Sequence, residues 1–365
     1  MALKCGIVGL PNVGKSTLFN AISSAKAQSA NFPFCTIEPN IGTITVPDER
    51  MTRLGELINP EKIIPTTIEI VDIAGLVRGA SKGEGLGNQF LATIREVNAI
   101  VHVVRCFEDD NVIHVHGKVD PVGDKEVIDT ELQFKDLETL EKRIDTIKRR
   151  AKGGDKDLAS QMDLMERLHA HISQGNNARS FATTPDEAEL MTDFYLLTTK
   201  PTIYVCNVEE TAVNTGNAHT ETFKAAVANE NAQVILISAA IEADIAELET
   251  YEERLVFLED MGLSEPGVHK VVHACYSILN LITYLTAGPK EIRAWTVLRG
   301  SKAPQAAGVI HTDFERGFIR AEVIKYEDYL KYKTEAAVKE AGKMGVEGKE
   351  YVVQDGDIMH FRFNV

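Results

Sequence analysis

Short apolar runs alternate with polar or glycine-rich stretches along much of the chain. Six of these runs have the length and the bounding turn residues of β-strands, at 4–8, 41–46, 67–71, 100–105, 201–206 and 233–237. Helical or glycine-rich connections separate them. Because strands that alternate with helices usually form a parallel sheet, the pattern predicts an α/β fold with a doubly wound sheet.

The period of the apolar residues changes between about 127 and 197, where they recur every three or four positions. The spacing predicts two amphipathic helices. The first series is Phe134, Leu137, Leu140, Ile144, Ile147 and Ala151, and the second is Leu158, Met162, Met165, Leu168 and Ile172. Since Gly153-Gly154-Asp155 between them predicts a helix stop and a turn, we expect an inserted antiparallel helical hairpin.

A helical stretch from Tyr251 to about Leu281 leads into a β-rich tail, with apolar runs at 292–298, 318–324 and 358–363. This tail is predicted to form a separate small α+β domain. The expected domains are a sheet domain at 1–125 and 198–280, an inserted hairpin at 126–197 and a C-terminal domain at 281–365.

Composition narrows the class of protein. A chain of 365 residues with 44% hydrophobic and 25% charged residues is expected to fold into two or three globular domains. No apolar run approaches the ~20 residues that cross a bilayer, and the N-terminus reads as a strand, so we expect a cytoplasmic protein. The five cysteines include no C-x-x-C pair, and we expect most of them to be buried thiols.

The net charge of −15 opposes general attraction to nucleic acid phosphates. One local group of basic residues stands out on the predicted hairpin: Lys142, Arg143, Lys148, Arg149, Arg150, Lys152 and Lys156. Two interpretations remain open, a surface that contacts RNA and an ordinary solvated helix face.

The segment from Gly9 to Ser16 reads G-L-P-N-V-G-K-S and lies between a predicted strand and a predicted helix. This is the phosphate-binding loop of P-loop nucleoside triphosphatases, in which backbone N–H groups and the helix N-terminus face the phosphates. Lys15 is expected to contact the β- and γ-phosphates, Ser16 to bind Mg²⁺, and Thr17 to contact the α-phosphate. The expected nucleotide-binding residues in this loop are Asn12, Val13, Gly14, Lys15, Ser16 and Thr17.

Two further segments supply candidate groups for the γ-phosphate and the metal. In the run V-D-I-A-G, Asp72 is expected to help hold Mg²⁺ and the Gly75 N–H to meet the γ-phosphate. Thr36, in the loop N-F-P-F-C-T-I, is a candidate second Mg²⁺ ligand. An Asp at a strand end is also common in plain turns, and Phe32 and Phe34 are equally suited to pinning a loop with an incidental Thr.

Taken in order, these residues resemble the translation-factor-like GTPases, and most closely the YchF or Obg-like ATPase subfamily of the Obg group. The resemblance rests on the phosphate loop, the N-F-P-F-C-T loop, the D-I-A-G-L-V run at Asp72 to Val77, the inserted hairpin and a tail similar to the TGS fold. It implies a ribosome-associated switch in translation that prefers ATP to GTP and contacts the large subunit. It also implies that Ser238-Ala239-Ala240 closes over the base, so that Ser238 and Ala239 join the nucleotide-binding residues.

Two departures from ordinary GTPases bear on the chemistry. Leu76 stands where many GTPases carry the Gln that orients the attacking water, so hydrolysis is expected to be slow or to depend on another group. His114 is one candidate for that group, although a loop histidine is often simply solvated.

The second departure is in the segment that reads the base, Asn207-Val208-Glu209-Glu210, where the guanine-selective Asp of N-K-x-D is absent. Asn207 and Val208 are expected to contact adenine, whereas Glu210 still offers an acceptor for guanine. A GTP-preferring enzyme and a nucleotide-gated scaffold with little hydrolysis therefore stay open. A metabolic kinase is disfavoured, since no acceptor-site motif is recognisable.

Overall fold

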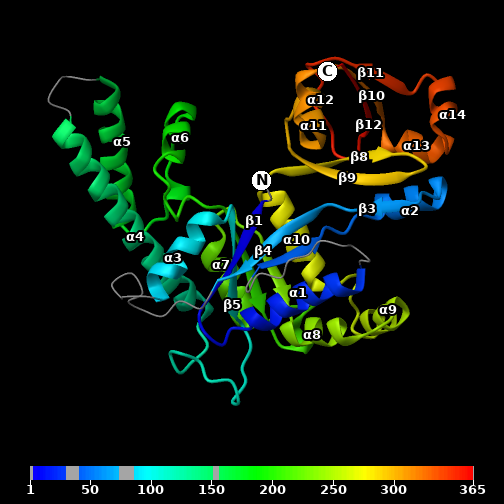
Figure 1. Cartoon of the computed structure of the whole chain (residues 1–365). Helices are drawn as coiled ribbons and strands as arrows, with labels where there is room; N and C mark the ends of the chain where they lie inside the picture. The colour runs from blue at the N-terminus through cyan, green and yellow to red at the C-terminus, as the bar shows by residue number, and fades with distance from the viewer. Residues whose placement is uncertain (1–2, 30–40, 74–85, 151–155, 365) are drawn as a thin grey trace. The chain divides into compact units, whose positions relative to one another are not determined.

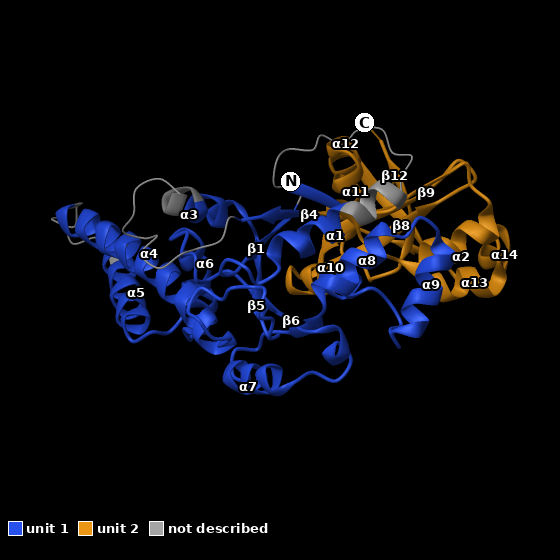
Figure 2. Cartoon of the chain, turned by 90° about the horizontal axis from the view of Figure 1, so that it is seen from below, with its two compact units in different colours: residues 1–43, 69–271 blue, residues 44–68, 272–365 orange. Residues whose placement is uncertain are grey.

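The computed structural model describes residues 3–29, 41–73, 86–150 and 156–364 (Figure 1). Contacts between residues divide the chain into two compact units (Figure 2). The first comprises Met1–Thr43 and Glu69–Val271, and the second comprises Ile44–Ile68 and Val272–Val365. None of the helices in these described ranges combines the length and the hydropathy that crossing a membrane needs.

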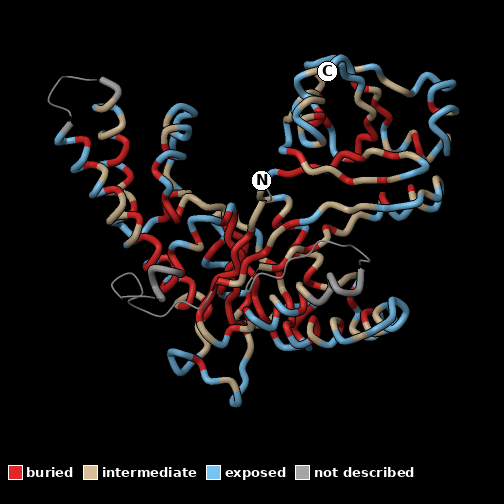
Figure 3. Tube along the Cα trace, viewed as in Figure 1, coloured by how far each residue is buried: buried red, intermediate tan, exposed pale blue. Residues whose placement is uncertain are grey.

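A six-stranded sheet forms the centre of the first unit, in the order β2-β4-β1-β5-β6-β7. The strands are β1 (Lys4–Val8), β2 (Ile41–Thr45), β4 (Thr67–Asp72), β5 (Ala99–Arg105), β6 (Thr202–Asn207) and β7 (Val234–Ile237). The neighbouring pairs from β4 through β1, β5 and β6 to β7 are parallel. Every residue of β5 and β6 is buried, as expected where helices cover both faces of a parallel sheet (Figure 3).

The helices associated with this sheet are α1 (Lys15–Ser29), α3 (Leu86–Glu96), α7 (Ala218–Val227), α8 (Ala239–Glu247), α9 (Tyr251–Asp260) and the start of α10 (Gly267–Ile278), with the short turn η2 (Glu210–Ala212). The α/β fold predicted from the sequence is confirmed, and each of the six predicted strands is present within one residue or so of its expected bounds. Cys5, Cys106 and Cys206 are free and buried in or beside the central strands, as small hydrophobes are.

The helical hairpin consists of α4 (Pro121–Arg150) and α5 (Lys156–Ser173), which pack against each other and are followed by η1 (Ala178–Ser180) and α6 (Pro185–Thr192) (Figure 1). Leu140, Ile144, Met165 and Leu168 belong to its buried cluster, which agrees with the predicted period. Phe134 was expected in that stripe but is 48% exposed, because the buried face of α4 at this level passes through Gln133, which is 8% exposed and donates to the Gly175 carbonyl oxygen at 3.0 Å.

A second six-stranded sheet, in the order β11-β10-β12-β8-β9-β3, forms the second unit. Its strands are β3 (Lys62–Ile64), β8 (Leu281–Ala287), β9 (Glu291–Leu298), β10 (Phe318–Ile324), β11 (Met344–Glu347) and β12 (Ile358–Phe363). Its helices are α2 (Glu49–Ile58), α11 (Ala303–Ile310), α12 (Thr312–Arg316), α13 (Tyr326–Tyr332) and α14 (Glu335–Glu340). Two buried clusters, one with α11 and one with α2 and α13, stabilise this mixed α+β arrangement.

The segment 44–68 groups differently from the sequence-based expectation, which placed it in the sheet domain at 1–125. Strand β3 pairs in parallel with β9, and α2 contributes Met51 and Leu54 to a buried cluster with Leu285. Because the paired segments are more than 220 residues apart, no local pattern in the sequence predicts this grouping. The three-domain boundaries themselves stay a prediction.

Candidate functional site

The phosphate loop connects β1 to α1, at the carboxyl edge of the parallel sheet. Its backbone enters the left-handed region at Asn12, with φ of 61°, and at Gly14, with φ of 95°. A Cβ atom on Gly14 would lie 2.3 Å from the Asn207 amide nitrogen, and one on Gly9 would lie 2.4 Å from the Val103 carbonyl oxygen. The two glycines of the motif are therefore required by backbone conformation and by close packing.

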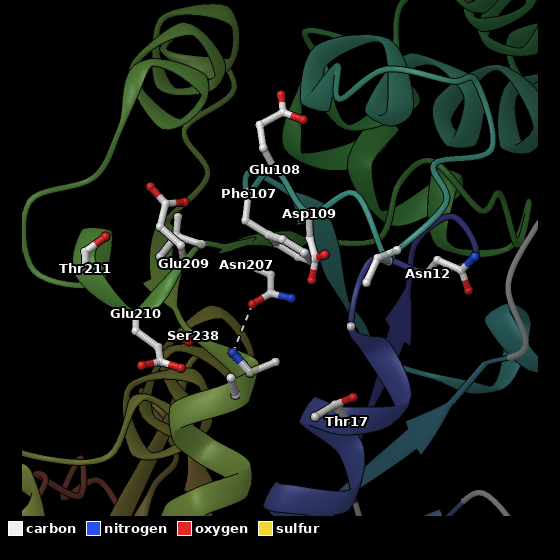
Figure 4. Close-up of a pocket in the computed structure, with 15 residues that line it drawn as sticks. Asn12, Thr17, Phe107, Glu108, Asp109, Asn207, Glu209, Glu210, Thr211 and Ser238 are labelled. Atoms are coloured by element: carbon white, nitrogen blue, oxygen red, sulfur yellow. Dashed lines mark hydrogen bonds between the residues drawn. The ribbon is translucent and has the colours of Figure 1, made fainter.

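Asn207 braces this loop from the end of β6. Its amide nitrogen donates to the Val13 carbonyl oxygen at 3.0 Å, and its amide oxygen accepts from the Ala239 N–H at 2.9 Å (Figure 4). The side chain is buried and links the phosphate loop to the N-terminus of α8. One N–H and one lone pair of the amide remain available to a ligand.

A cavity of about 620 Å³ opens between these segments, a size suited to a nucleotide. It brings together eight of the residues predicted from the sequence: Asn12, Gly14, Thr17, Asn207, Val208, Glu210, Ser238 and Ala239. Val13 does not line it, but its carbonyl holds Asn207.

The cavity wall also includes Glu209 and Ala240, which belong to the two base-side segments named from the sequence, and sequence reasoning missed the rest of the wall, which consists of Phe107, Glu108, Asp109, Val112 and Thr211. Phe107 projects towards the middle of the cavity and offers an aromatic ring to a planar base (Figure 4). The signal in the sequence was an aromatic residue two positions after Arg105, the last residue of the buried strand β5. Glu209 is held at the wall by Asn217, whose amide nitrogen lies 2.9 Å from Oε2.

Lys15 is buried at the start of α1, and its ammonium donates to the Leu10 carbonyl oxygen at 2.6 Å. Burial lowers the pKa of Lys15 to about 8, opposed by the nearby charge of Asp72. The Lys15 ammonium is buried within the loop, where it can exchange the Leu10 carbonyl oxygen for phosphate oxygens.

Ser16 and Asp72 come together beside Lys15, with Ser16 Oγ 3.5 Å from Asp72 Oδ2. The other carboxylate oxygen, Oδ1, is buried and has no hydrogen-bond partner among the described residues. Desolvation raises the pKa of Asp72, while the charge of Lys15 and the Ser16 hydroxyl lower it. A hydroxyl and an unsatisfied carboxylate oxygen are the hard ligands that Mg²⁺ prefers, so these residues fit the predicted metal.

His114 lies in the loop after β5 and is only 8% exposed, so the interpretation of a solvated histidine is wrong. Its Nε2 lies 2.9 Å from Asp124 Oδ2, and its Nδ1 accepts the His116 N–H at 3.1 Å. Because a backbone N–H can only donate, Nδ1 of His114 is an acceptor and its Nε2–H donates to Asp124. In this arrangement both nitrogens of His114 are engaged.

The same loop touches the phosphate loop, since the Asn12 amide nitrogen donates to the Ile113 carbonyl oxygen at 3.1 Å. His114 is therefore one residue away from a direct contact with the candidate site. Two other predicted groups, Thr36 and Gly75, lie outside the described residues, as does Leu76.

Comparisons with known proteins give the same picture for the whole chain. Residues 4–145 match the family described as "50S ribosome-binding GTPase", and residues 281–364 match YchF-GTPase_C, described as "Protein of unknown function (DUF933)". Proteins called "Ribosome-binding ATPase YchF" from Haemophilus ducreyi and Bacillus subtilis are each 55% identical to this chain, over 100% of both chains. The protein of that name from Escherichia coli O157:H7 is 54% identical, also over 100% of both.

A solved structure described as the Schizosaccharomyces pombe YchF GTPase superposes with a TM-score of 0.90 at 39% identity. The match covers 99% of this chain and 97% of the other. The names of these proteins disagree on the nucleotide, since the bacterial relatives are called ATPases and the yeast structure a GTPase.

Proposed function

This chain belongs to the YchF family of P-loop nucleoside triphosphatases, and on that basis we propose that it hydrolyses ATP, in preference to GTP, as a switch in translation. The observation that carries the nucleotide preference is the cavity wall at Asn207 to Glu210. Where a guanine-selective site presents an Asp, this wall has Glu210, and the adjacent Glu209 is held by Asn217. A site that lacks the Asp carboxylate of guanine-selective enzymes no longer has the interaction that favours guanine over adenine.

We assign adenine recognition to the aromatic ring of Phe107 and the side-chain amide of Asn207. Phe107 offers stacking area, and Asn207 retains one N–H and one lone pair after bracing the loop. Adenine presents a donor amine and an acceptor ring nitrogen, which this amide matches. Ser238 and Ala239, at the N-terminus of α8, line the same cavity and are proposed to close over the base.

Ser16 and Asp72 would hold Mg²⁺, with Thr36 as a further ligand proposed from the sequence, and the bound ion would offset charge on the phosphate oxygens. Lys15 supplies a second positive charge to the β- and γ-phosphates. The Gly75 N–H is proposed to contact the γ-phosphate. The reaction is attack of water on the γ-phosphate, in line with the leaving oxygen.

Because Leu76 stands where many GTPases have Gln, the attacking water lacks the usual side chain that orients it. We propose that His114 orients this water instead. For this, its ring must exchange the Asp124 or His116 partner for the water, so hydrolysis requires a rearrangement of the loop after β5. This requirement favours slow basal turnover that a bound partner accelerates.

The ribosome, through its large subunit, is the proposed partner, because the full-length relatives are called ribosome-binding. The basic residues on α4 are proposed to contact RNA there. The second candidate function is a nucleotide-gated scaffold with little hydrolysis, which the engaged ring of His114 and the apolar Leu76 favour.

Competition of ATP, GTP and their diphosphates for one fluorescent analogue tests the preference, and ATP is expected to bind at least about tenfold more tightly than GTP.

Lys15→Ala is expected to reduce kcat by about 100-fold or more and to weaken binding. Ser16→Ala is expected to weaken Mg²⁺-dependent turnover. Tight GTP binding with poor ATP binding, or near-normal turnover in both variants, would contradict the proposal.

Phosphate release with and without ribosomes separates the two candidate functions. Stimulation of steady-state release by large subunits supports the switch. An unstimulated rate, with ATP still bound tightly, supports the scaffold.

A further inference from the structure

Arg105 is the last residue of β5 and is 2% exposed, which places its large charged side chain among the most buried in the described chain. Its guanidinium donates three hydrogen bonds, all to backbone carbonyl oxygens of the loop that follows. Nε donates to Phe107 at 3.0 Å, Nη1 to Val112 at 2.7 Å and Nη2 to Asp109 at 3.2 Å.

No carboxylate within the described ranges forms an ion pair with Arg105, whereas Lys125 and Arg179, which are also largely buried, each pair with carboxylates. Burying a charge without a counter-ion is costly unless other groups compensate it. The compensation comes from the three carbonyl dipoles and from the Phe107 ring, whose centroid lies 4.5 Å from Cζ. A neutral side chain of similar size would fill this space at lower cost, so the charge has a use beyond packing.

All three carbonyl acceptors belong to residues that line the candidate nucleotide cavity. The planar fork of one guanidinium therefore fixes the positions of Phe107, Asp109 and Val112 relative to β5. None of these three hydrogen bonds reaches a residue of the phosphate loop.

We propose that Arg105 is a positioning residue for nucleotide recognition, holding the cavity wall so that Phe107 meets the base in one fixed pose. This rests on the proposed function, because it assumes that a purine nucleotide occupies the cavity. Arg105 acts on the base through Phe107 and leaves the phosphate contacts to the loop at Gly9 to Thr17. Its loss weakens binding of the base and spares binding of the phosphates.

The test compares ATP with tripolyphosphate, each with Mg²⁺, by calorimetry on wild type, Arg105→Lys and Arg105→Met. Lys has one nitrogen in place of the fork and cannot reach three carbonyls at once. Both variants are expected to raise the Kd for ATP by about tenfold, the scale of one base–aromatic stack. The Kd for tripolyphosphate is expected to stay within about twofold, because that ligand has no base to meet Phe107.

Arg179→Lys is the matched control, since Arg179 is a half-buried arginine of the same unit that pairs with Asp129 and Glu230, away from the cavity. It is expected to lower the melting temperature without changing the ratio of the two Kd values. In a Phe107→Ala background, Arg105→Lys is expected to cause no further loss of ATP affinity.

Equal weakening of ATP and tripolyphosphate, or loss of folding in both Arg105 variants by circular dichroism, would overturn the proposal and leave Arg105 a role in folding alone. Unchanged ATP affinity would overturn it as well. A wild-type protein that prefers GTP would instead overturn the proposed function, and the same comparison made with GTP would still test Arg105.

Discussion

Single residues decide whether the phosphate loop can close around a ligand. Asn12 tolerates a left-handed backbone because Asn is one of the few side chains that does, whereas Gly14 combines that backbone with a contact that excludes any Cβ. The phosphate-loop motif in the sequence predicted both Gly9 and Gly14. That the Gly14 restriction comes from Asn207, 193 residues away, is visible only in the folded chain.

Gly14→Ala is expected to weaken ATP binding by at least tenfold, because the new methyl must displace the Asn207 amide that braces the loop. Gly175→Ala is the control, since Gly175 has a similar φ of 85° but open space around its Cβ position. The control is expected to cost about 1 kcal/mol of stability and to leave the Kd unchanged. Equal Kd values for the two variants would contradict the role of the contact.

His102, in the middle of β5, is fully buried, and its Nε2 has no hydrogen-bond partner among the described residues. Burial lowers the pKa of His102 to about 4, with smaller and opposing contributions from the surrounding charges of Asp129, Lys125, Arg179 and Glu230. The folded protein therefore holds this ring neutral.

Because the pKa of His102 is lower in the folded than in the unfolded state, stability is full above about pH 6.5 and falls as the pH drops towards 4. The loss attributable to this ring is on the order of 3 kcal/mol at most. Chemical denaturation at pH 7 and pH 4.5 measures it, and His102→Gln is expected to show a smaller difference between the two conditions. An equal difference in wild type and variant would contradict the assignment.

At the scale of elements, local periodicity predicted the hairpin, but a buried carboxylate anchors it. Asp136 on α4 accepts from the Leu197 N–H at 2.7 Å, the Thr198 N–H at 2.8 Å and the Thr198 hydroxyl at 2.7 Å. These bonds attach α4 to the segment by which the chain returns to β6. An acidic residue inside an amphipathic helix looks like an exposed position in the sequence, so this anchor could not be predicted.

Asp136→Asn replaces one acceptor oxygen by a donor that faces backbone N–H groups, and is expected to reduce the free energy of unfolding by about 1–3 kcal/mol. Asp145→Asn, at an exposed position of the same helix, is expected to change it by less than about 0.5 kcal/mol. Urea unfolding monitored by circular dichroism makes the comparison. Similar values for both variants would remove Asp136 as an anchor.

At the scale of the whole molecule, the charge distribution bears on the proposed ribosome contact. The chain has a net charge of −15, and some basic residues of α4 are already paired, Lys142 with Glu138 and Lys148 with Glu166 at 3.2 Å. Arg143 instead lies over the Phe194 ring at 5.9 Å. The basic surface of α4 therefore offers less positive charge to RNA phosphates than the number of basic residues in the sequence indicates.

Lys142→Glu combined with Arg149→Glu is expected to lower co-sedimentation with ribosomes and to flatten its dependence on salt, since fewer cations then face phosphates. Lys224→Glu combined with Lys290→Glu changes the net charge equally at positions off the hairpin. Sedimentation that falls equally in both pairs points to net charge alone. No change in the hairpin pair identifies this surface as a solvated helix face.

The sequence by itself determined the α/β fold, the hairpin and the phosphate loop, because each depends on residues close together in the chain: a strand period, a helix period and eight consecutive letters. It also predicted that Asn207 and Glu210 contact the base, and both residues line the cavity. The tertiary structure alone decided that 44–68 joins the C-terminal sheet, that Phe107 completes the cavity wall, and that His114 is buried against Asp124. These features depend on contacts between distant segments and on which face of a loop is covered, and neither leaves a periodic trace along the chain.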